Sequence, residues 1–297
     1  MILLDGKKVS EAIKAELSEK LRALTDLGAP APCLAAILTG DNPASKTYVS
    51  SKIRSCEQVG FQSRLIELPE TVSEEDLLRE VRALNADPEV TGYIVQLPLP
   101  RHIDETRTTL AIDPTKDVDG FHPVNFGRMA LGLPALLPAT PYGIIELLRR
   151  YEVPTSGKHC VVIGRSNIVG RPISILLSQK GFDCTVTVTH SRTHNLQAEV
   201  SRADIVIAAI GIPQFVKADW IKEGAVVIDV GINRIADETR KSGFRIVGDV
   251  DFEQVAPKCS FITPVPGGVG LMTVAMLMMN TWIAARERLS DKFEVNR

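Results

Sequence analysis

HCVVIGRSNIVGRPISILLSQKG, residues 159–181, is the stretch that decides the fold. It opens on an apolar run of strand length, HCVVIG, and closes on RPISILLSQKG, which has the pattern of a buried helix. The turn between them reads GxSxxxG, with Gly164 and Gly170 at its ends and Ser166 inside. A strand, a glycine turn and a helix in this order are typical of a dinucleotide-binding fold.

The chemistry of this turn suits a pyrophosphate, because backbone N–H groups and the helix dipole both favour an anion at a helix N-terminus. The next strand, CTVTVTH (184–190), ends without the acidic residue that an NAD site uses for its ribose. Ser191, Arg192 and Arg165 offer donors for a 2′-phosphate instead, which favours NADP. A turn with no ligand, and two merely solvated arginines, are the alternatives.

Strands continue beyond this unit, at 203–211, 225–231 and 244–250. Together they predict a doubly wound, Rossmann-like dinucleotide-binding domain over residues 140–265. Thr140 and Pro141 resemble an N-cap and first helical position, opening a helix through Arg150.

The N-terminal part alternates in the same way and predicts a second parallel sheet covered by helices. Its expected elements are a helix at 8–27, a strand at 33–40, a helix at 43–60, a strand at 64–69, a helix at 73–85 and a strand at 92–100. Residues 112–140 are rich in Pro and Gly and are interpreted as the connection between domains. The fold class is therefore α/β with two domains. The first is an N-terminal α/β substrate domain of residues 1–120, to which a C-terminal helix within 272–297 returns.

Composition bounds the function classes. The chain has 297 residues, 44% hydrophobic and 24% charged, with a formal net charge of −2. A net charge this close to zero favours neither a nucleic acid nor a membrane surface as a partner. The first twenty residues mix charged and apolar positions, so no signal peptide is expected. VAMLMMNTWIAA (274–285) is too short for a membrane span and is interpreted as a buried helix.

The five cysteines, Cys33, Cys56, Cys160, Cys184 and Cys259, form no CxxC pair and sit mostly in apolar runs. They are interpreted as core residues of a cytoplasmic protein. His190 and His194 are four apart without an evident third ligand, so no metal site is expected. KDVDG (116–120) resembles the start of a calcium loop but lacks the closing Glu.

Candidate chemistry lies in the first domain. Tyr48 and Lys52 are four apart and share a helix face. Gln96 ends a buried strand, where open α/β sheets bind ligands, and Asp119 follows in a loop. A desolvated Lys52 would have a lowered pKa and serve as general acid or base, with Gln96 orienting its amine. Asp119 would accept hydrogen bonds from a ligand. A solvated, structural lysine is the competing interpretation.

Seven motifs occur together in one order: GDNPASKTYVSSK (40–52), VQLPLP (95–100), KDVDGFHPVN (116–125), GRSNIVGRP (164–172), DVGIN (229–233), GDVDF (248–252) and TPVPGGVG (263–270). With them the chain resembles the bifunctional methylenetetrahydrofolate dehydrogenase/methenyltetrahydrofolate cyclohydrolase family over nearly its whole length. The resemblance implies oxidation of 5,10-methylenetetrahydrofolate by hydride transfer to NADP, then hydrolysis to 10-formyltetrahydrofolate at the same site. It also implies a homodimer.

The resemblance assigns roles residue by residue. Lys52 is implied to be catalytic, with Tyr48 stacking on the folate and Gln96 supporting Lys52, and Asp119 is implied to bind the pterin ring. The other implied substrate contacts are Leu97, Pro98, Pro264, Gly267 and Gly268. The implied cofactor contacts are Gly164, Arg165, Ser166, Ser191, Arg192 and Ile232.

Two positions depart from the family pattern. The chain has Ala139 where the family often has Cys, and Leu271 where it usually has Pro. Three other functions stay open at this point. They are a dehydrogenase of the amino-acid or shikimate type, a non-catalytic nucleotide-binding protein, and a specialist that kept only one of the two steps. The motifs YVSSK, VQLPLP and KDVDG together argue against the first, and the set of Tyr48, Lys52, Gln96 and Asp119 argues against the second.

Overall fold

The computed structural model describes residues 1–240 and 243–294, and the chain divides into two compact units. Met1–Ser10 and Thr140–Thr273 form one, here named the six-stranded unit. Glu11–Ala139 and the residues from Val274 onward form the other, the three-stranded unit. The division differs from the predicted one at the N-terminus. The first ten residues join the six-stranded unit, because β1 (Ile2–Leu3) pairs with β11 (Cys259–Ile262), a strand of that unit.

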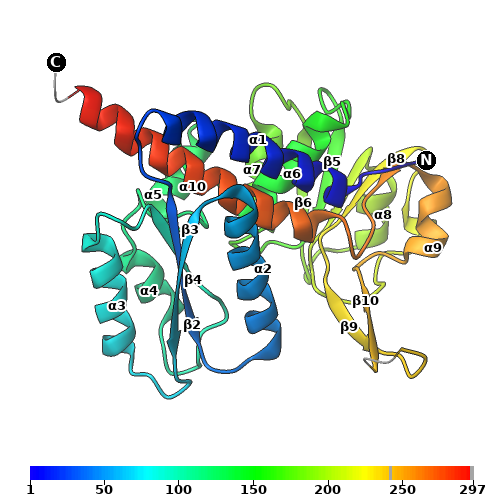
Figure 1. Ribbon diagram of the computed structural model, residues 1–297. Helices are drawn as coiled ribbons and strands as arrows, with labels where there is room; N and C mark the ends of the chain where they lie inside the picture. Colours follow the sequence, from blue (N-terminus) through cyan, green and yellow to red (C-terminus); the bar gives the residue numbers. More distant parts are fainter. Residues whose placement is uncertain (241–242, 295–297) are drawn as a thin grey trace. The chain divides into compact units, whose positions relative to one another are not determined.

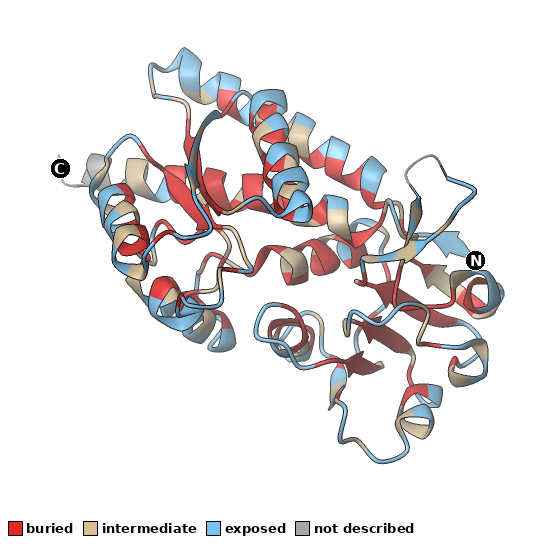
Figure 2. Ribbon diagram, turned by 90° about the horizontal axis from the view of Figure 1, so that it is seen from below, coloured by how far each residue is buried: buried red, intermediate tan, exposed pale blue. Residues whose placement is uncertain are grey.

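The six-stranded sheet is parallel throughout and has the order β1-β11-β8-β7-β5-β6. Its other strands are β5 (His159–Ile163), β6 (Thr185–Thr189), β7 (Ile205–Ala208), β8 (Ala225–Asp229) and β11 (Cys259–Ile262). Buried Val, Ile and Ala fill the central strands, as expected for a sheet covered on both faces, and Figure 2 shows these strands in red. The Rossmann-like fold is confirmed, whereas β1 and β11 were not predicted.

The strand predicted at 244–250 lies outside this sheet. β10 (Phe244–Val247) pairs antiparallel with β9 (Asn233–Ala236) in a separate two-stranded sheet, visible as a hairpin in Figure 1. None of the four residues of β10 is fully buried. A half-exposed strand suits a hairpin, whereas the central strands of a doubly wound sheet are buried on both faces.

Helices connect the strands of the six-stranded unit. They are α6 (Ala139–Arg150), α7 (Gly170–Ser178), α8 (Leu196–Ser201) and α9 (Phe252–Val255), with short 3-10 turns η1 (Ala218–Trp220) and η2 (Ala256–Lys258). α6 begins one residue before the predicted N-cap Thr140, whose hydroxyl instead forms a 2.9 Å hydrogen bond with that of Thr273.

The three-stranded sheet has the order β3-β2-β4 and is also parallel. Its strands are β2 (Cys33–Thr39), β3 (Gln62–Leu68) and β4 (Gly92–Val95). In Figure 1 helix α2 (Pro43–Val59) covers one face, and α3 (Glu74–Ala86) and α4 (Glu105–Ala111) cover the other. Ser73 caps α3, since its hydroxyl accepts a hydrogen bond from the Asp76 amide.

The segment 112–140, predicted to be an irregular connection, contains helix α5 (Pro123–Ala130). The His122 ring accepts the Val124 amide as N-cap, and Pro123 occupies the first turn. This eight-residue helix is too short to show a clear helical periodicity, and Pro123, Gly132 and Pro134 lie at or near its ends. The segment before the helix is held to it, because Asn125 donates to the Pro114 carbonyl and to Asp117.

Helices α1 (Gly6–Asp26) and α10 (Val269–Glu294) each begin in the six-stranded unit and continue into the three-stranded one. The Val269–Leu289 part of α10 has the length and composition of a membrane span, with a mean hydropathy of 1.3. Two-thirds of its most apolar window is buried, which is also the property of a core helix. Within the three-stranded unit, Met278 of α10 lies 3.7 Å from the Cys56 sulfur on α2.

All five cysteines are buried free thiols. Burial raises the pKa of each thiol, to about 12 for Cys56 and Cys259 and about 11 for Cys184. A raised pKa leaves little thiolate at neutral pH, so these side chains behave as small core residues.

Candidate active site

Lys52 lies in the third turn of α2 and is buried, with 5% of its surface exposed. Its Nζ donates to the Oε1 of Gln96 at 3.1 Å and lies 5.7 Å from the centre of the Tyr48 ring. Asn42 caps this helix by accepting the amides of Ala44 and Ser45. The one-turn spacing of Tyr48 and Lys52 therefore brings both side chains to one place.

Gln96 is held in a single orientation directly after β4. Its backbone amide donates to Ile37 on β2, and its Nε2 donates to the Leu97 carbonyl at 2.7 Å. The amide nitrogen is thus occupied, which leaves the oxygen for Lys52. A neutral acceptor fixes the position of the amine without stabilising its positive charge as a carboxylate would.

The titratable groups here perturb one another. Burial lowers the pKa of Lys52, and the negative charge of Asp119 partly opposes that effect. Burial raises the pKa of Asp119, and Lys52 opposes it in turn. The pKa of Tyr48 is raised by burial and by Asp119. Perturbed groups gathered in one place are typical of functional sites.

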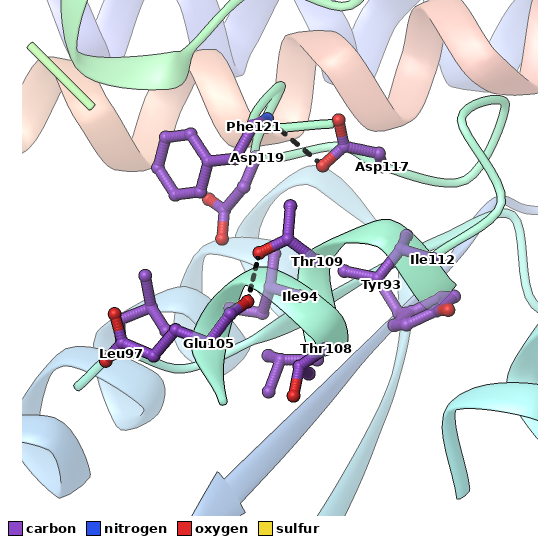
Figure 3. A pocket seen from close by; sticks show the side chains of 11 residues that line it. Tyr93, Ile94, Leu97, Glu105, Thr108, Thr109, Ile112, Asp117, Asp119 and Phe121 are labelled. Atoms are coloured by element: carbon purple, nitrogen blue, oxygen red, sulfur yellow. Dashed lines mark hydrogen bonds between the residues drawn. The ribbon is translucent and has the colours of Figure 1, made fainter. Parts of the chain in front are cut away.

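The two acids of KDVDG have different tasks. Asp117 is 1% exposed and accepts the amides of Phe121 and His122 and the side-chain amide of Asn125. Asp119 is half-buried and lines a pocket with Leu97 and Phe121. In Figure 3 the Asp117 carboxylate is joined to Phe121, whereas that of Asp119 extends into the pocket. Asp117 shapes the loop, whereas the Asp119 carboxylate faces the pocket.

The other predicted substrate contacts divide between the units. Leu97 lines the Asp119 pocket, and Pro98 is exposed beside it after a cis peptide bond. Pro264, Gly267 and Gly268 belong to the six-stranded unit. There the Gly267 carbonyl accepts the Lys7 amide at 3.1 Å, and a Cβ on Gly268 would lie 2.5 Å from the Pro264 oxygen.

The glycine turn at residues 164–170 is closely packed. Gly164 has φ +118°, and a Cβ there would lie 2.3 Å from the Ala209 oxygen. A Cβ on Gly170 would lie 2.3 Å from the Gly164 oxygen. The Ser166 hydroxyl accepts the amides of Val169 and Gly170, which ties the turn to the start of α7. Glycine is required at both ends of this turn.

The loops after β5 and β6 meet at one edge of the sheet, because the Gly164 amide donates to the Thr189 carbonyl at 3.0 Å. Arg165, Ser166, Ser191 and Arg192 are all exposed there. His190 orders the second loop by accepting the Arg192 amide on its Nδ1. Within the described residues no group of three His, Cys, Asp or Glu side chains is arranged for a metal.

Ile232 is 52% exposed in the loop after β8. Two buried acids of the same unit, Asp229 and Asp249, were not predicted from the sequence. Asp229 accepts the amides of Gly231, Asp249 and Val250. Burial, more than the neighbouring Asp249, raises the pKa of Asp229 to about 7.

Asp249 is fully buried and accepts the amides of Ile210 and Gly211 and the side-chain amide of Asn233. The motifs DVGIN and GDVDF contained both acids. Neither motif by itself, however, indicates whether its acid is a buried structural residue or lies in a surface loop.

The two departures from the family pattern are both accommodated. Ala139 is 2% exposed and donates its amide to the Asp119 carbonyl at 3.3 Å. Leu271 is 39% exposed in the first turn of α10. A helical first turn accepts either Pro or Leu.

Comparison with known proteins identifies the family. Residues 4–119 match the family described as tetrahydrofolate dehydrogenase/cyclohydrolase, catalytic domain, and residues 138–289 match the NAD(P)-binding domain of the same family. The bifunctional protein FolD of Flavobacterium johnsoniae is 59% identical over 290 residues, which are 97% of this chain and 98% of that protein.

Two solved structures are similar throughout. The bifunctional FolD of Campylobacter jejuni is 49% identical with a TM-score of 0.92, over 97% of this chain and 99% of that one. FolD of Trypanosoma brucei, solved with NADP and an inhibitor, is 39% identical with a TM-score of 0.93, over 97% and 98% of the two chains. Because both domains of the family match in order along the chain, the chain belongs to the tetrahydrofolate dehydrogenase/cyclohydrolase family.

Proposed function

We propose that this protein oxidises 5,10-methylenetetrahydrofolate to the methenyl compound with NADP, and then hydrolyses that compound to 10-formyltetrahydrofolate. The observation that carries the proposal is Lys52, a buried amine with a lowered pKa whose hydrogen-bond acceptor is a neutral amide. Family membership supplies the substrate class, since the matched catalytic domain is defined by tetrahydrofolate chemistry.

The residues of the three-stranded unit take separate roles. Asp119, half-buried in its pocket, accepts hydrogen bonds from the N–H groups of the pterin ring. The Tyr48 ring gives a flat face for stacking beside Lys52. In the hydrolysis, the neutral Lys52 amine takes a proton from the water that attacks the methenyl carbon. Gln96 holds the amine in place during that transfer.

The six-stranded unit fits NADP. Gly164 and Gly170 let the turn pack closely, because a Cβ on either would overlap a backbone oxygen, and Ser166 anchors the turn at the start of α7. Arg165, Ser191 and Arg192 are exposed at the joined ends of β5 and β6, where they would hold the 2′-phosphate. When bound, the nicotinamide accepts the hydride; the chain's own task is to position it. The exposed Ile232 would contact the nicotinamide ring.

Assembly and location complete the proposal. The buried free thiols favour the reducing cytoplasm. The net charge of −2 favours neither a membrane surface nor a nucleic acid as a partner. We place the enzyme there as a homodimer, as the family resemblance implies. Light scattering on the purified protein tests the dimer.

One time course tests the activity. Purified protein is mixed with methylenetetrahydrofolate and with NADP or NAD, and reduced nucleotide and methenyl compound are followed by absorbance. We expect reduction with NADP and little accumulation of methenyl compound. Accumulation that decays at the uncatalysed rate would leave a dehydrogenase alone. No reduction with either nucleotide would overturn the proposal and favour a nucleotide-binding protein.

A further inference from the structure

Helix α10 carries a fully buried asparagine that the catalytic roles above leave unused. Asn280 is 0% exposed, and its Nδ2 donates two hydrogen bonds of 2.8 Å. One acceptor is the carbonyl of Val118 and the other is the carbonyl of Leu137. The two carbonyls are 19 positions apart in the chain, so one side chain joins two separate segments of the three-stranded unit.

The orientation of this amide is unambiguous, because two carbonyl oxygens require the nitrogen to face them. The other end of the amide has no such match. The Oδ1 of Asn280 finds no hydrogen-bond partner among the described residues. A buried acceptor without a partner costs free energy. An amide retained at that cost points to a task for its two donors.

The segments that Asn280 joins are those around Asp119. Val118 directly precedes Asp119, and the Asp119 carbonyl accepts the Ala139 amide at 3.3 Å. Gly120 has φ +73°, and a Cβ on it would lie 2.4 Å from the Leu137 carbonyl carbon. The backbone of Asp119 and Gly120 therefore packs closely against the segment that contains Leu137. Asn280 donates one hydrogen bond to each of the two segments.

A further contact fixes the loop from its other side. The Lys116 carbonyl accepts the Tyr93 amide at 2.9 Å, which extends the pairing of β4 to the loop. The position of Val118 is thus bounded by β4 on one side and by α10 on the other. The Asp119 carboxylate leaves this support and extends into the pocket of Figure 3.

We propose that Asn280 is a positioning residue for the folate substrate, acting through the Val118 and Leu137 carbonyls to hold Asp119 against the pterin ring. The proposal rests on the function proposed above for Asp119. The substrate itself meets Asp119; Asn280 sets how far the carboxylate can depart from the binding position. A C-terminal helix thereby contributes to substrate affinity without touching the ligand.

The test is a substitution that keeps the shape and removes both donors, Asn280→Leu, measured in the full-length protein. Thr281→Val is the matched control. Thr281 is equally buried on the same helix, but among the described residues its hydroxyl donates to the Leu277 carbonyl of that same helix. We expect Asn280→Leu to raise the KM for methylenetetrahydrofolate about tenfold and the KM for NADP less than twofold. Thr281→Val should leave both within twofold.

A double-mutant cycle separates positioning from general damage to the fold. Asp119→Asn removes the charge that Asn280 is proposed to place. In that background Asn280→Leu should change the folate KM by less than twofold, because its effect passes through the Asp119 carboxylate. An equal loss in both backgrounds, or an equal rise in the NADP KM, would overturn the proposal.

Two further measurements keep the outcome clear. If Asn280→Leu does not fold, as judged by circular dichroism, Asn280→Ser replaces it in the same cycle, because its single hydroxyl donor cannot bond to both carbonyls at once. The wild-type time course is run beside each variant. An inactive wild type defeats the proposed function itself, whereas an active wild type with an unchanged Asn280→Leu KM defeats only this inference.

Discussion

The Nζ of Lys52 and the Oε1 of Gln96 lie 3.1 Å apart, so a buried amine is held by a neutral amide. A carboxylate in the place of Gln96 would stabilise the charged amine and raise its pKa. With an amide there, desolvation prevails and the pKa of Lys52 is lowered. A lysine with a lowered pKa releases its proton more readily than a solvated lysine, which favours its use as a general base in the hydrolysis of a methenyl cation.

Replacing Lys52 should remove the hydrolysis and spare the fold. Lys52→Met keeps the length of the side chain in a helix that tolerates Met well. We expect the hydrolysis of methenyltetrahydrofolate to fall at least about 100-fold, with an unchanged circular dichroism spectrum. Lys46→Met on the same helix is the control, because Lys46 is exposed and pairs with Asp41. Hydrolysis at the wild-type rate in Lys52→Met would contradict the role of Lys52.

The pH profile of the hydrolysis should respond to Asp119. The Asp119 charge raises the pKa of Lys52, against the larger effect of burial. Asp119→Asn removes that charge, so the limb of the profile that reports Lys52 should move to lower pH. The comparison is the pH-rate profile of Asp41→Asn, which makes the same charge change at a side chain that is 91% exposed. A limb that moves to higher pH, or equally in both variants, would refute the coupling.

Cofactor choice should depend on Arg192. Arg192→Glu puts a negative charge where we place the 2′-phosphate, so NADP should bind about tenfold or more weakly and NAD much less so. Lys180→Glu makes the same charge change beyond the C-terminal end of α7 and should affect neither nucleotide. Titration of each nucleotide by fluorescence gives both constants. Equal losses for NADP and NAD in Arg192→Glu would move the contact to Arg165.

Asp229 should make the stability of the protein depend on pH. Its folded pKa is raised by burial to about 7, against about 3.9 for an unfolded chain. A group with a raised folded pKa favours folding below its unfolded pKa, and that stability is lost as pH rises through the folded pKa. Relative to Asp229→Asn, the wild type should therefore lose up to about 4 kcal/mol of unfolding free energy between pH 4 and pH 7.

Urea titrations of both proteins at several pH values measure this difference. The Asn variant loses one acceptor at every pH, so the change of the difference with pH is the quantity that matters. Asp204→Asn should give the opposite slope, and only below about pH 4, because the Lys222 partner lowers the pKa of Asp204. A constant difference between the wild type and Asp229→Asn would show that Asp229 does not titrate in this range.

Local sequence was enough for most of the elements and for part of the site. The i, i+4 spacing of Tyr48 and Lys52 determined that they share a helix face, since helical periodicity is a property of neighbouring residues. The turn at Gly164 was equally local, because its φ of +118° admits glycine and few other residues. Seven motifs in order then identified the family.

Tertiary structure decided what depends on residues far apart in the chain. The pairing of Ile2 with Phe261 assigned the first residues to the six-stranded unit, and no local pattern of two exposed strand residues predicts that partner. The burial of Lys52 followed in the same way from the elements packed around α2. The two donors of Asn280 found carbonyls more than 140 positions away. Periodicity is local and is written in the sequence, whereas burial and pairing depend on contacts that only the folded chain provides.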